Sequence, residues 1–403
     1  MRNKIWIAIL VIMLLATGCS SPTAAPTTMA VEPSATSVQE TLAPAETIAP
    51  TALPTAAPLE FQATFEQGAC PFDVPGEAVD DVLCGFVVVP ADHADPAGDT
   101  IRLAVVVIKD RSAAHQPDPV ILLAGGPGEK VVANAIPVAV QLAPLHPNRD
   151  LVIFDQRGVG LSEPALECPE FMPAMLDLLD ESEPEAAAKI QFNALMTCKD
   201  RLVKEGHNLS LYTTQQNAAD VNAIRIALGY DRINLHGSSY GSHLAQAVMR
   251  DYPQYIRSVA INSVWPLEKS LSVDGSTTFT QAILHLLDSC QSDEACNSAY
   301  PDLHQTLFEV IDRLNAAPVP ISITNPVDGK TYDALLTGDG VLGNLSAFLY
   351  VTRIIPILPQ AIYDVYNGDY ELISQLSGTR LALLSATTRG MMFSVLCTED
   401  LVG

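Results

Sequence analysis

The sequence predicts an α/β fold in which a mostly parallel sheet carries helices on both faces. Short, uniformly apolar runs alternate along the chain with stretches of helical periodicity. Such runs are typical of strands buried on both faces, and the helices between them supply the crossovers that parallel strands need. Strands are expected at residues 85–90, 101–110, 120–124, 151–155, 232–236 and 258–262, with the first two forming a leading hairpin.

The composition limits the class of protein. The chain has 403 residues, of which 48% are hydrophobic, so global disorder is excluded and either one large domain with an insertion or two domains are expected. Asp and Glu number 46 against 22 Lys and Arg, which gives a formal net charge of −24 and argues against nucleic-acid binding. Eight cysteines in an acidic chain indicate an oxidising compartment.

Residues 1–18 have the pattern of a secretory signal. Arg2 and Lys4 precede an apolar run, residues 5–15, that is shorter than a membrane span of ~20 residues. The small residues before Cys19 resemble a bacterial lipoprotein signal, in which that cysteine is lipidated; an ordinary signal peptide with an incidental cysteine is the alternative. We expect an exported protein, anchored through Cys19 to the outer side of a bacterial membrane in the cell envelope.

Residues 19–58 are expected to be a tether. Ala, Thr and Pro make up 25 of the 39 residues that follow Cys19, and aromatic residues, Lys and Arg are absent from them. Such a segment buries too little apolar surface to offset the entropy of an ordered chain, and its prolines favour extended conformations. It would hold a folded domain away from the membrane surface.

The rest of the chain divides into three predicted parts. Residues 59–265 contain the predicted strands and form the core. Residues 266–390 are mostly helical, with a hairpin expected around Asp328 and Gly329, and would form a lid inserted after the last predicted strand. Residues 391–403 begin a segment that returns to the core.

The strongest chemical signal follows the strand at residues 232–236. Gly237, Ser239 and Gly241 have the G-x-S-x-G spacing of a nucleophile elbow, between a predicted strand and a predicted helix. Small residues on both sides let the chain turn sharply and present the hydroxyl of Ser239 at a helix N-terminus, where developing negative charge is favoured. A glycine-rich structural turn is the alternative.

Two further segments end predicted strands. The loop Gly125-Gly126-Pro127-Gly128 can offer a backbone N–H to an oxyanion, although it could also be a tight turn; it lacks the G-K-[ST] ending of a phosphate loop. Asp155 and Arg157 begin the segment DQRGVGLS, for which a buried Arg–Asp network that shapes the active-site rim is favoured over direct catalysis. We expect no cofactor and no metal.

These three segments, in this order, carry a family resemblance. GGPG, DQRGVGLS and HGSSYG look like the proline iminopeptidase and tripeptidyl aminopeptidase group of α/β-hydrolase serine peptidases, and residues 212–230 and 397–400 also look like the secreted tripeptidyl aminopeptidases. The resemblance covers the chain from about residue 85 to its last residue. Two departures stand near the glycine loop: Ala124, where many relatives have His, and Glu129-Lys130, where small residues are common.

The resemblance implies the α/β-hydrolase fold and acyl-enzyme catalysis on short peptides. Ser239 would be the nucleophile, and the backbone N–H of Tyr240 with that of Gly125 or Gly126 would form the oxyanion hole. A histidine would accept the serine proton, and an acid would orient that histidine. By the same resemblance Glu399 and Asp400 would bind the free amine of the substrate, with a solvated turn as the alternative.

The base and the acid are not found in the sequence. In this fold both follow the serine, and the histidines after Ser239 are His243, His285 and His304. His243 lies one turn along the predicted helix and would point away from the serine, while the other two fall in the predicted lid. We therefore expect that the sequence is truncated at its C-terminus, that the last strands of the sheet are missing, and that the chain is inactive as it stands.

Cysteine spacing suggests three disulfides. Sequential pairing joins Cys70 to Cys84, Cys168 to Cys198 and Cys290 to Cys296, although sequence alone leaves other pairings open. With Cys19 lipidated, Cys397 is expected to be left over.

The sequence thus favours an exported, membrane-tethered serine aminopeptidase that releases short N-terminal peptides or residues. A carboxylesterase with the same nucleophile, and a catalytically inactive surface-binding homologue, are the alternatives.

Overall fold

The computed structural model describes residues 62–74, 76 and 80–400. The expectations for the signal peptide, for Cys19 and for the tether lie outside these residues. Within the described part, the expected strands and helices can be compared with the structure element by element.

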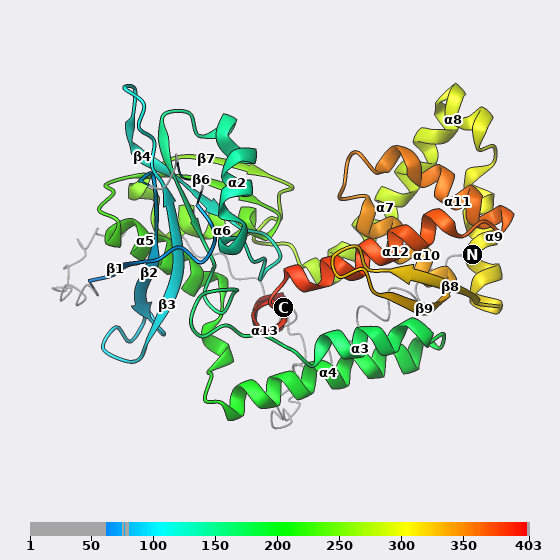
Figure 1. Ribbon diagram of the computed structural model, residues 1–403, viewed down its shortest axis with the longest axis horizontal. Coiled ribbons are helices and arrows are strands. Elements are labelled where there is room, and N and C mark those ends of the chain that lie inside the picture. Colours follow the sequence, from blue (N-terminus) through cyan, green and yellow to red (C-terminus); the bar gives the residue numbers. More distant parts are fainter. Residues whose placement is uncertain (1–61, 75, 77–79, 401–403) are drawn as a thin grey trace, which may run out of the picture. The chain divides into compact units, whose positions relative to one another are not determined.

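The fold is built on a seven-stranded sheet with the order β1-β2-β3-β5-β4-β6-β7 (Figure 1). β2 and β3 form the expected hairpin, and β4, β5, β6 and β7 are parallel to their neighbours within that group. The antiparallel pairs lie at the other side of the sheet, which is therefore mixed. The strands are β1 Thr64–Gly68, β2 Val82–Pro90, β3 Thr100–Ile108, β4 Gln116–Leu123, β5 Arg149–Phe154, β6 Ile233–Ser238 and β7 Ile256–Asn262.

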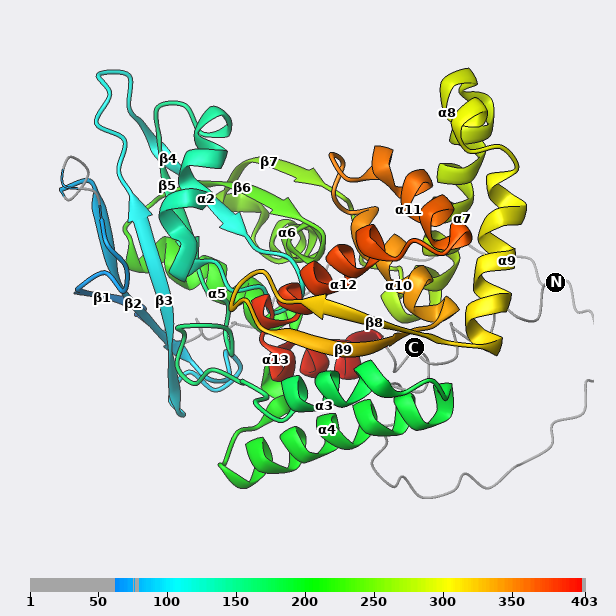
Figure 2. The ribbon, with the colours of Figure 1, turned by 45° about the vertical axis from the view of Figure 1, so that its right-hand side comes forward.

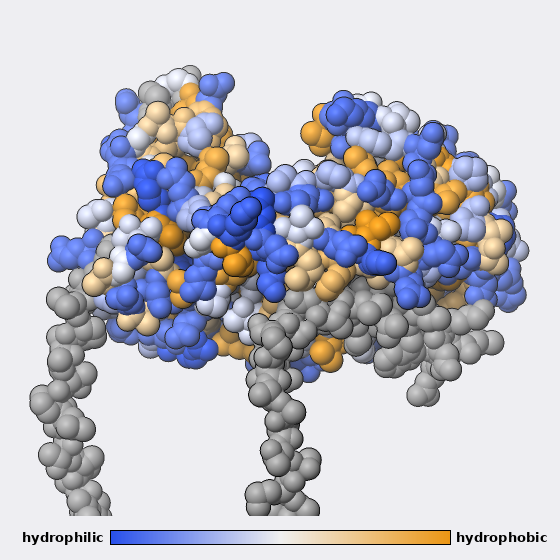
Figure 3. Space-filling view, turned by 90° about the horizontal axis from the view of Figure 1, so that it is seen from below, coloured by the Kyte–Doolittle hydropathy of each residue, from blue (hydrophilic) through white to orange (hydrophobic). Residues whose placement is uncertain are grey.

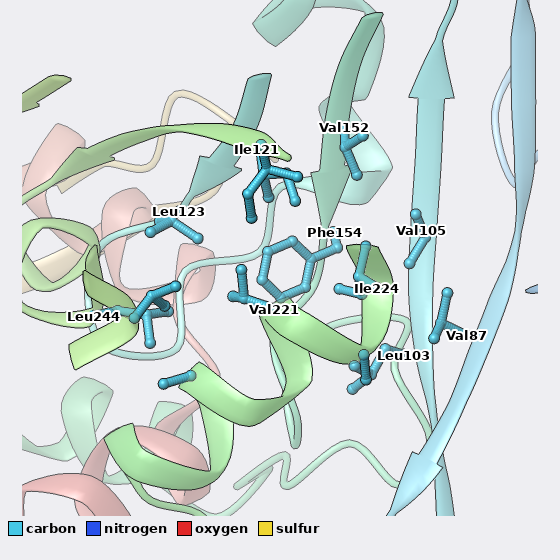
Figure 4. Close-up of a cluster of buried hydrophobic side chains, with 14 of the residues drawn as sticks. Val87, Leu103, Val105, Ile121, Leu123, Val152, Phe154, Val221, Ile224 and Leu244 are labelled. Carbon is cyan, nitrogen blue, oxygen red and sulfur yellow. The ribbon is translucent and has the colours of Figure 1, made fainter. Parts of the chain in front are cut away.

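Helices cover both faces of the sheet, as predicted. On one face, α5 (Thr214–Ala227) and α6 (Tyr240–Asp251) contribute Val221, Ile224 and Leu244 to a buried cluster with strand residues such as Phe154 (Figure 4). On the other face, α2 (Ala135–Leu142) packs on the alternate residues of the same strands. The strands are apolar on both sides because neither side faces water.

A mainly helical region follows the sheet. We call residues 271–383 the cap; its helices share a hydrophobic cluster of their own, and its hairpin β8–β9 encloses the turn that the sequence predicts around Gly329. Figure 2 shows this hairpin beside α3 and α4, and an apolar cluster joins it to α3. The elements of the cap are α7 Leu271–Ser292, α8 Glu294–Ala299, α9 Leu303–Ala316, β8 Val319–Thr324, β9 Thr331–Leu336, α10 Gly338–Phe348, α11 Leu358–Asn367 and α12 Glu371–Leu383.

Three more α-helices of the described residues fall outside the cap. α3 (Phe171–Asp177) and α4 (Pro184–Lys204) follow β5, and α13 (Arg389–Val395) follows the cap. A π-helical turn, Leu396–Asp400, continues α13. That residues 266–390 act as a lid stays a prediction.

The structure contains the three disulfides that sequential pairing gives, Cys70–Cys84, Cys168–Cys198 and Cys290–Cys296. No described cysteine is a free thiol, so the expectation that Cys397 is left over is wrong. Three bridges within the described residues are consistent with folding in an oxidising compartment.

The exterior is largely polar. Figure 3 shows one face, on which hydrophilic residues predominate and apolar ones are interspersed. Among the described helices, none combines the length and the apolar character that crossing a membrane requires.

Candidate active site

Ser239 lies in the sharp turn between β6 and α6. Its backbone has φ 55° and ψ −124°, a left-handed conformation that costs a non-glycine residue of the order of 1–3 kcal/mol. Hydrogen bonds hold the turn on both sides: the N–H of Ser239 donates to the carbonyl of Asn262 in β7 (3.3 Å), and the N–H of Ser242 donates to the carbonyl of Ser239 (2.9 Å). This is the geometry of a nucleophile elbow.

The two glycines of the elbow are required by close backbone contacts. A Cβ on Gly237 would lie 2.3 Å from the carbonyl oxygen of Gly241, and a Cβ on Gly241 would lie 1.9 Å from the carbonyl oxygen of Leu123 in β4. Both distances are far inside van der Waals contact. The G-x-S-x-G spacing therefore reflects the packing of α6 against the ends of β6 and β4.

The glycine loop after β4 lies directly against the nucleophile. A Cβ on Gly125 would stand 3.4 Å from the Cβ of Ser239. On the other side of the serine, Tyr240 is the first residue of α6, so its N–H has no acceptor within the helix. The structure thus places the loop in contact with Ser239, directly before the N-terminus of α6, so backbone N–H groups of both segments lie close to the serine, as an oxyanion site requires.

The N–H of Gly125 already has a partner. It donates to a carboxylate oxygen of Glu129 (3.0 Å), one of the residues by which the sequence departs from the family pattern. Among the described residues, the N–H of Gly126 makes no hydrogen bond. Of the two loop donors expected from the sequence, Gly126 is the one whose N–H is available in this arrangement, and the contact of Glu129 was not foreseen.

The loop is fixed to the segment that follows the cap. The N–H of Thr388 donates to the carbonyl of Gly128 (2.8 Å), and the N–H of Lys130 donates to the carbonyl of Ala386 (3.1 Å). The ammonium group of Lys130 also pairs with Glu167 at 2.8 Å. Residues far apart in the sequence therefore hold the loop beside Ser239.

Asp155 organises two loops at this edge of the sheet. One carboxylate oxygen accepts hydrogen bonds from the N–H groups of Val131 and Val132 (2.8 and 3.0 Å), and the other accepts one from Leu161 (2.8 Å). Its side chain is buried, and burial raises the pKa of Asp155 because loss of water outweighs these three donors. The role is structural, in line with the interpretation favoured from the sequence.

Arg157 forms the expected buried Arg–Asp pair, but with Asp220 instead of Asp155. Its Nε and Nη2 donate to the two carboxylate oxygens of Asp220, each at 2.7 Å, and its Nη1 donates to the carbonyls of Ala91 and Leu211. His93 reaches Asp220 from the other side at 2.8 Å. Burial alone would raise the pKa of Asp220, but the Arg157 guanidinium and His93 hold it below its ordinary value.

Glu399 and Asp400 bind the N-termini of two helices. The carboxylate of Glu399 accepts from the N–H and the hydroxyl of Thr214 at the start of α5, both at 2.5 Å. That of Asp400 accepts from the N–H groups of Leu271 and Ser272 at the start of α7, at 2.6 and 2.8 Å. Carboxylates are stabilised at this end of a helix, so these contacts account for both residues without a substrate. The amine-binding role stays a prediction.

No histidine completes a catalytic triad in the part of the chain that the structure describes. All eight histidines of the sequence lie there, and none is hydrogen-bonded to the hydroxyl of Ser239. The ring of His243 packs against Trp265, with 4.6 Å between centroids, and burial lowers the pKa of His243. His304 pairs with Asp288 at 2.8 Å, within the cap.

A metal site is not available from the described residues either. Their one group with suitable spacing is Cys168, Glu170 and Cys198, and its two cysteines are joined in a disulfide, so they offer no thiolate.

One family profile and several known proteins are similar to this chain. Residues 118–279 match the family profile described as "alpha/beta hydrolase fold", and the chain has that fold. It is 29% identical over 329 residues to the serine protease Hip1 of Mycobacterium tuberculosis, which covers 77% of this chain and 59% of that protein. It is 33% identical over 195 residues to the tripeptidyl aminopeptidase of Streptomyces lividans, which covers 45% and 35%. The chain therefore spans less than two thirds of the length of these relatives.

Among solved structures, the crystal structure of the proline iminopeptidase of Mycobacterium smegmatis matches with 18% identity and a TM-score of 0.31, over 68% of this chain and 69% of that one. The resemblance drawn from the sequence motifs is confirmed by the sequence relatives.

Proposed function

We propose that this chain, a serine hydrolase of the α/β-hydrolase family, is an exported and membrane-tethered aminopeptidase that releases short N-terminal peptides or residues. The observation that carries the catalytic part is the backbone of Ser239, held at positive φ between β6 and α6 with the glycine loop in contact. Such a conformation persists only where surrounding contacts maintain it, and it exposes the hydroxyl beside N–H groups that can stabilise an oxyanion.

The proposed reaction proceeds through an acyl-enzyme. The hydroxyl oxygen of Ser239 attacks the carbonyl carbon of the scissile bond, and the N–H groups of Tyr240 and Gly126 donate to the oxygen that becomes negative. The bond from carbon to the leaving amine breaks, that amine takes a proton, and water then hydrolyses the acyl-serine. The proton of Ser239 needs an acceptor in the first step.

That acceptor is missing from the described surroundings of Ser239. A serine hydroxyl without an adjacent base is a weak nucleophile. None of the eight histidines is hydrogen-bonded to Ser239, so we propose that the polypeptide Met1–Gly403 turns over substrates slowly by itself. The same observation supports the alternative of an inactive surface-binding homologue.

Export and tethering rest on the sequence signals and on the disulfides. Residues 1–18 and Cys19 have the lipoprotein pattern, and three disulfides suit an oxidising compartment. Cys19→Ala should move the protein from the membrane fraction to the soluble fraction. Equal membrane association of wild type and variant would contradict the anchor.

Chemical rescue tests the role of Ser239. Imidazole in solution can act as the missing base, and general base catalysis is typically worth 10²–10⁴-fold in rate. We expect imidazole to increase hydrolysis of p-nitrophenyl acetate by roughly tenfold over the same reaction with Ser239→Ala, since a base free in solution is poorly positioned. Ser292→Ala, which changes an exposed serine of α7, is the matched control. Equal rates for wild type and Ser239→Ala would support the inactive homologue.

Substrate choice separates peptidase from esterase. Under rescue conditions an aminopeptidase should release p-nitroaniline from tripeptidyl p-nitroanilides with a free amine, and more slowly from their N-acetylated forms. Hydrolysis confined to simple esters and blocked peptides would instead assign the carboxylesterase function.

A further inference from the structure

The cap contains a cavity that no part of the proposed catalytic centre lines. Its volume is about 480 Å³, within the range of small-molecule sites. Residues of α7, α9, α10 and α12 line it, together with the start of α4, and none comes from the elbow or from the glycine loop. Much of the wall is apolar and consists of Phe279, Ile283, Leu284, Leu307, Ile311 and Leu342.

One cation faces this cavity without a counterion. Arg380, near the end of α12, forms no ion pair with any residue that the structure describes. Its guanidinium lies over the backbone of Gly343 in α10, because a Cβ on Gly343 would stand 2.9 Å from Nη1 and 3.1 Å from Cζ. The absence of a side chain at residue 343 thus gives the planar guanidinium its place on the cavity wall, where its N–H groups make no hydrogen bond to any described residue.

Three carboxylates line the same cavity without a cation. Glu181 and Glu183 lie just before α4, and Asp339 stands in the first turn of α10. None of the three is within 4 Å of Arg380 or of another basic group among the described residues. Opposite charges therefore line one cavity without forming an ion pair among the described residues.

We propose that this cavity binds short apolar peptides that have both termini free. Arg380 receives the terminal carboxylate, for which a guanidinium offers paired donors, and the acidic group receives the terminal ammonium. The apolar wall receives the side chains between them. A fatty acid or an inorganic anion fits less well, because the three carboxylates repel a ligand that carries negative charge alone.

This inference rests on the proposed function for its class of ligand, since an aminopeptidase produces and consumes such peptides. The cavity would hold a peptide apart from Ser239, as a store or an effector site. Binding at the cavity and hydrolysis at Ser239 can be measured separately, so the failure of one leaves the other intact.

The experiment measures binding of tri-leucine by calorimetry to the full chain carrying Ser239→Ala, in which hydrolysis cannot consume the ligand. We expect one site per chain. Loss of a hydrogen-bonded charge contact typically costs 1.5–3 kcal/mol, so tri-leucine amide and N-acetyl tri-leucine should each bind about tenfold or more weakly. Arg380→Gln should cause a similar loss for tri-leucine and almost none for the amide, because the contact is already absent.

Arg353→Gln, an exposed arginine outside the cavity, is the matched control and should bind like the parent. Gly343→Ala should weaken binding several-fold, since the guanidinium must shift to make room. Undetectable binding of tri-leucine at millimolar concentration, or unchanged binding with Arg380→Gln, would overturn the proposal. Equal binding of the free and N-acetylated peptides would overturn it in favour of a plain carboxylate site.

Discussion

The sheet core and the cap differ in where their charged side chains lie. In the core, Arg157 and Asp220 are almost fully buried and satisfy each other with two hydrogen bonds of 2.7 Å. In the cap, all of which the structure describes, the buried polar residues are the neutral Thr306 and Asn344. Arg380, which has no ion pair among the described residues, lines a cavity. The core uses buried charge to fix geometry, whereas the cap is held by apolar packing, and its ion pairs, such as that of His304 with Asp288, are partly or fully exposed.

The sheet core and the cap should therefore differ in how well they tolerate substitutions. The elbow, the glycine loop and the Arg157–Asp220 pair depend on contacts that admit one arrangement, as catalysis needs. Charged residues on the surface of the cap can be substituted with little loss of stability, because its apolar cluster is unaffected. Changes of ligand preference are therefore easiest there.

Gly241→Ala should have the largest effect. The added methyl group would stand 1.9 Å from the carbonyl oxygen of Leu123 and 3.1 Å from that of Ala124, and these backbone atoms leave it no room. We expect a loss of about 4 kcal/mol or more in the free energy of unfolding, or failure to fold. Urea denaturation followed by circular dichroism measures this loss.

The control is Gly68→Ala, at the end of β1, where a Cβ meets nothing within 4 Å. It should leave stability almost unchanged. A stable Gly241→Ala protein would mean that α6 can move away from β4. The contact between these two elements would then not fix the conformation of the elbow.

Arg157→Met should have the next largest effect on stability. It leaves the carboxylate of Asp220 buried without its guanidinium, a type of change that costs about 3–5 kcal/mol. Arg102→Met, which removes a half-exposed arginine paired with Glu66 and Glu163, should cost about 1 kcal/mol or less. Thermal and urea unfolding of the two variants compares a buried with a surface arginine.

The pH dependence of the free energy of unfolding should also change sign with Arg157→Met. In the wild type the pKa of Asp220 is lowered, so its contribution is present above about pH 4, the pKa of an unfolded aspartate, and is lost as the pH falls below that. In the variant, burial without the guanidinium raises the pKa of Asp220, so acidification from pH 7 to pH 5 favours the folded state. The stability gap between wild type and variant should narrow over that range, and a constant gap would contradict the assignment.

Short-range patterns predicted much of the core. The run expected at residues 151–155 is β5, Arg149–Phe154, because an unbroken apolar run reflects burial on both faces. The elbow was also predictable, since Gly237 and Gly241 are needed by contacts within a few residues and the adjacent strand. Local sequence carries this information because local geometry creates the requirement.

Features that depend on distant partners were missed. β1, Thr64–Gly68, has mostly exposed side chains, and its strand conformation comes from pairing with β2 rather than from an apolar pattern. The partner of Arg157 is 63 residues away, on α5, whereas the sequence indicated a buried Arg–Asp network without naming Asp220. An acid on the apolar side of α5 was the signal that could have pointed to Asp220.

Arg380→Gln should have the smallest effect on stability. Arg380 has no ion pair to lose among the described residues, and the contact that glutamine removes is the packing of the guanidinium on Gly343 of α10. We expect a change within about 0.5 kcal/mol, measured by the same urea unfolding as Arg157→Met, since surface substitutions away from buried networks fall in that range. Asp339→Asn, which changes a carboxylate in the first turn of α10, should behave alike. A loss above about 1.5 kcal/mol with Arg380→Gln would mean that the cap, like the core, is held by a charged contact, and the arginine would then support the fold instead of a ligand.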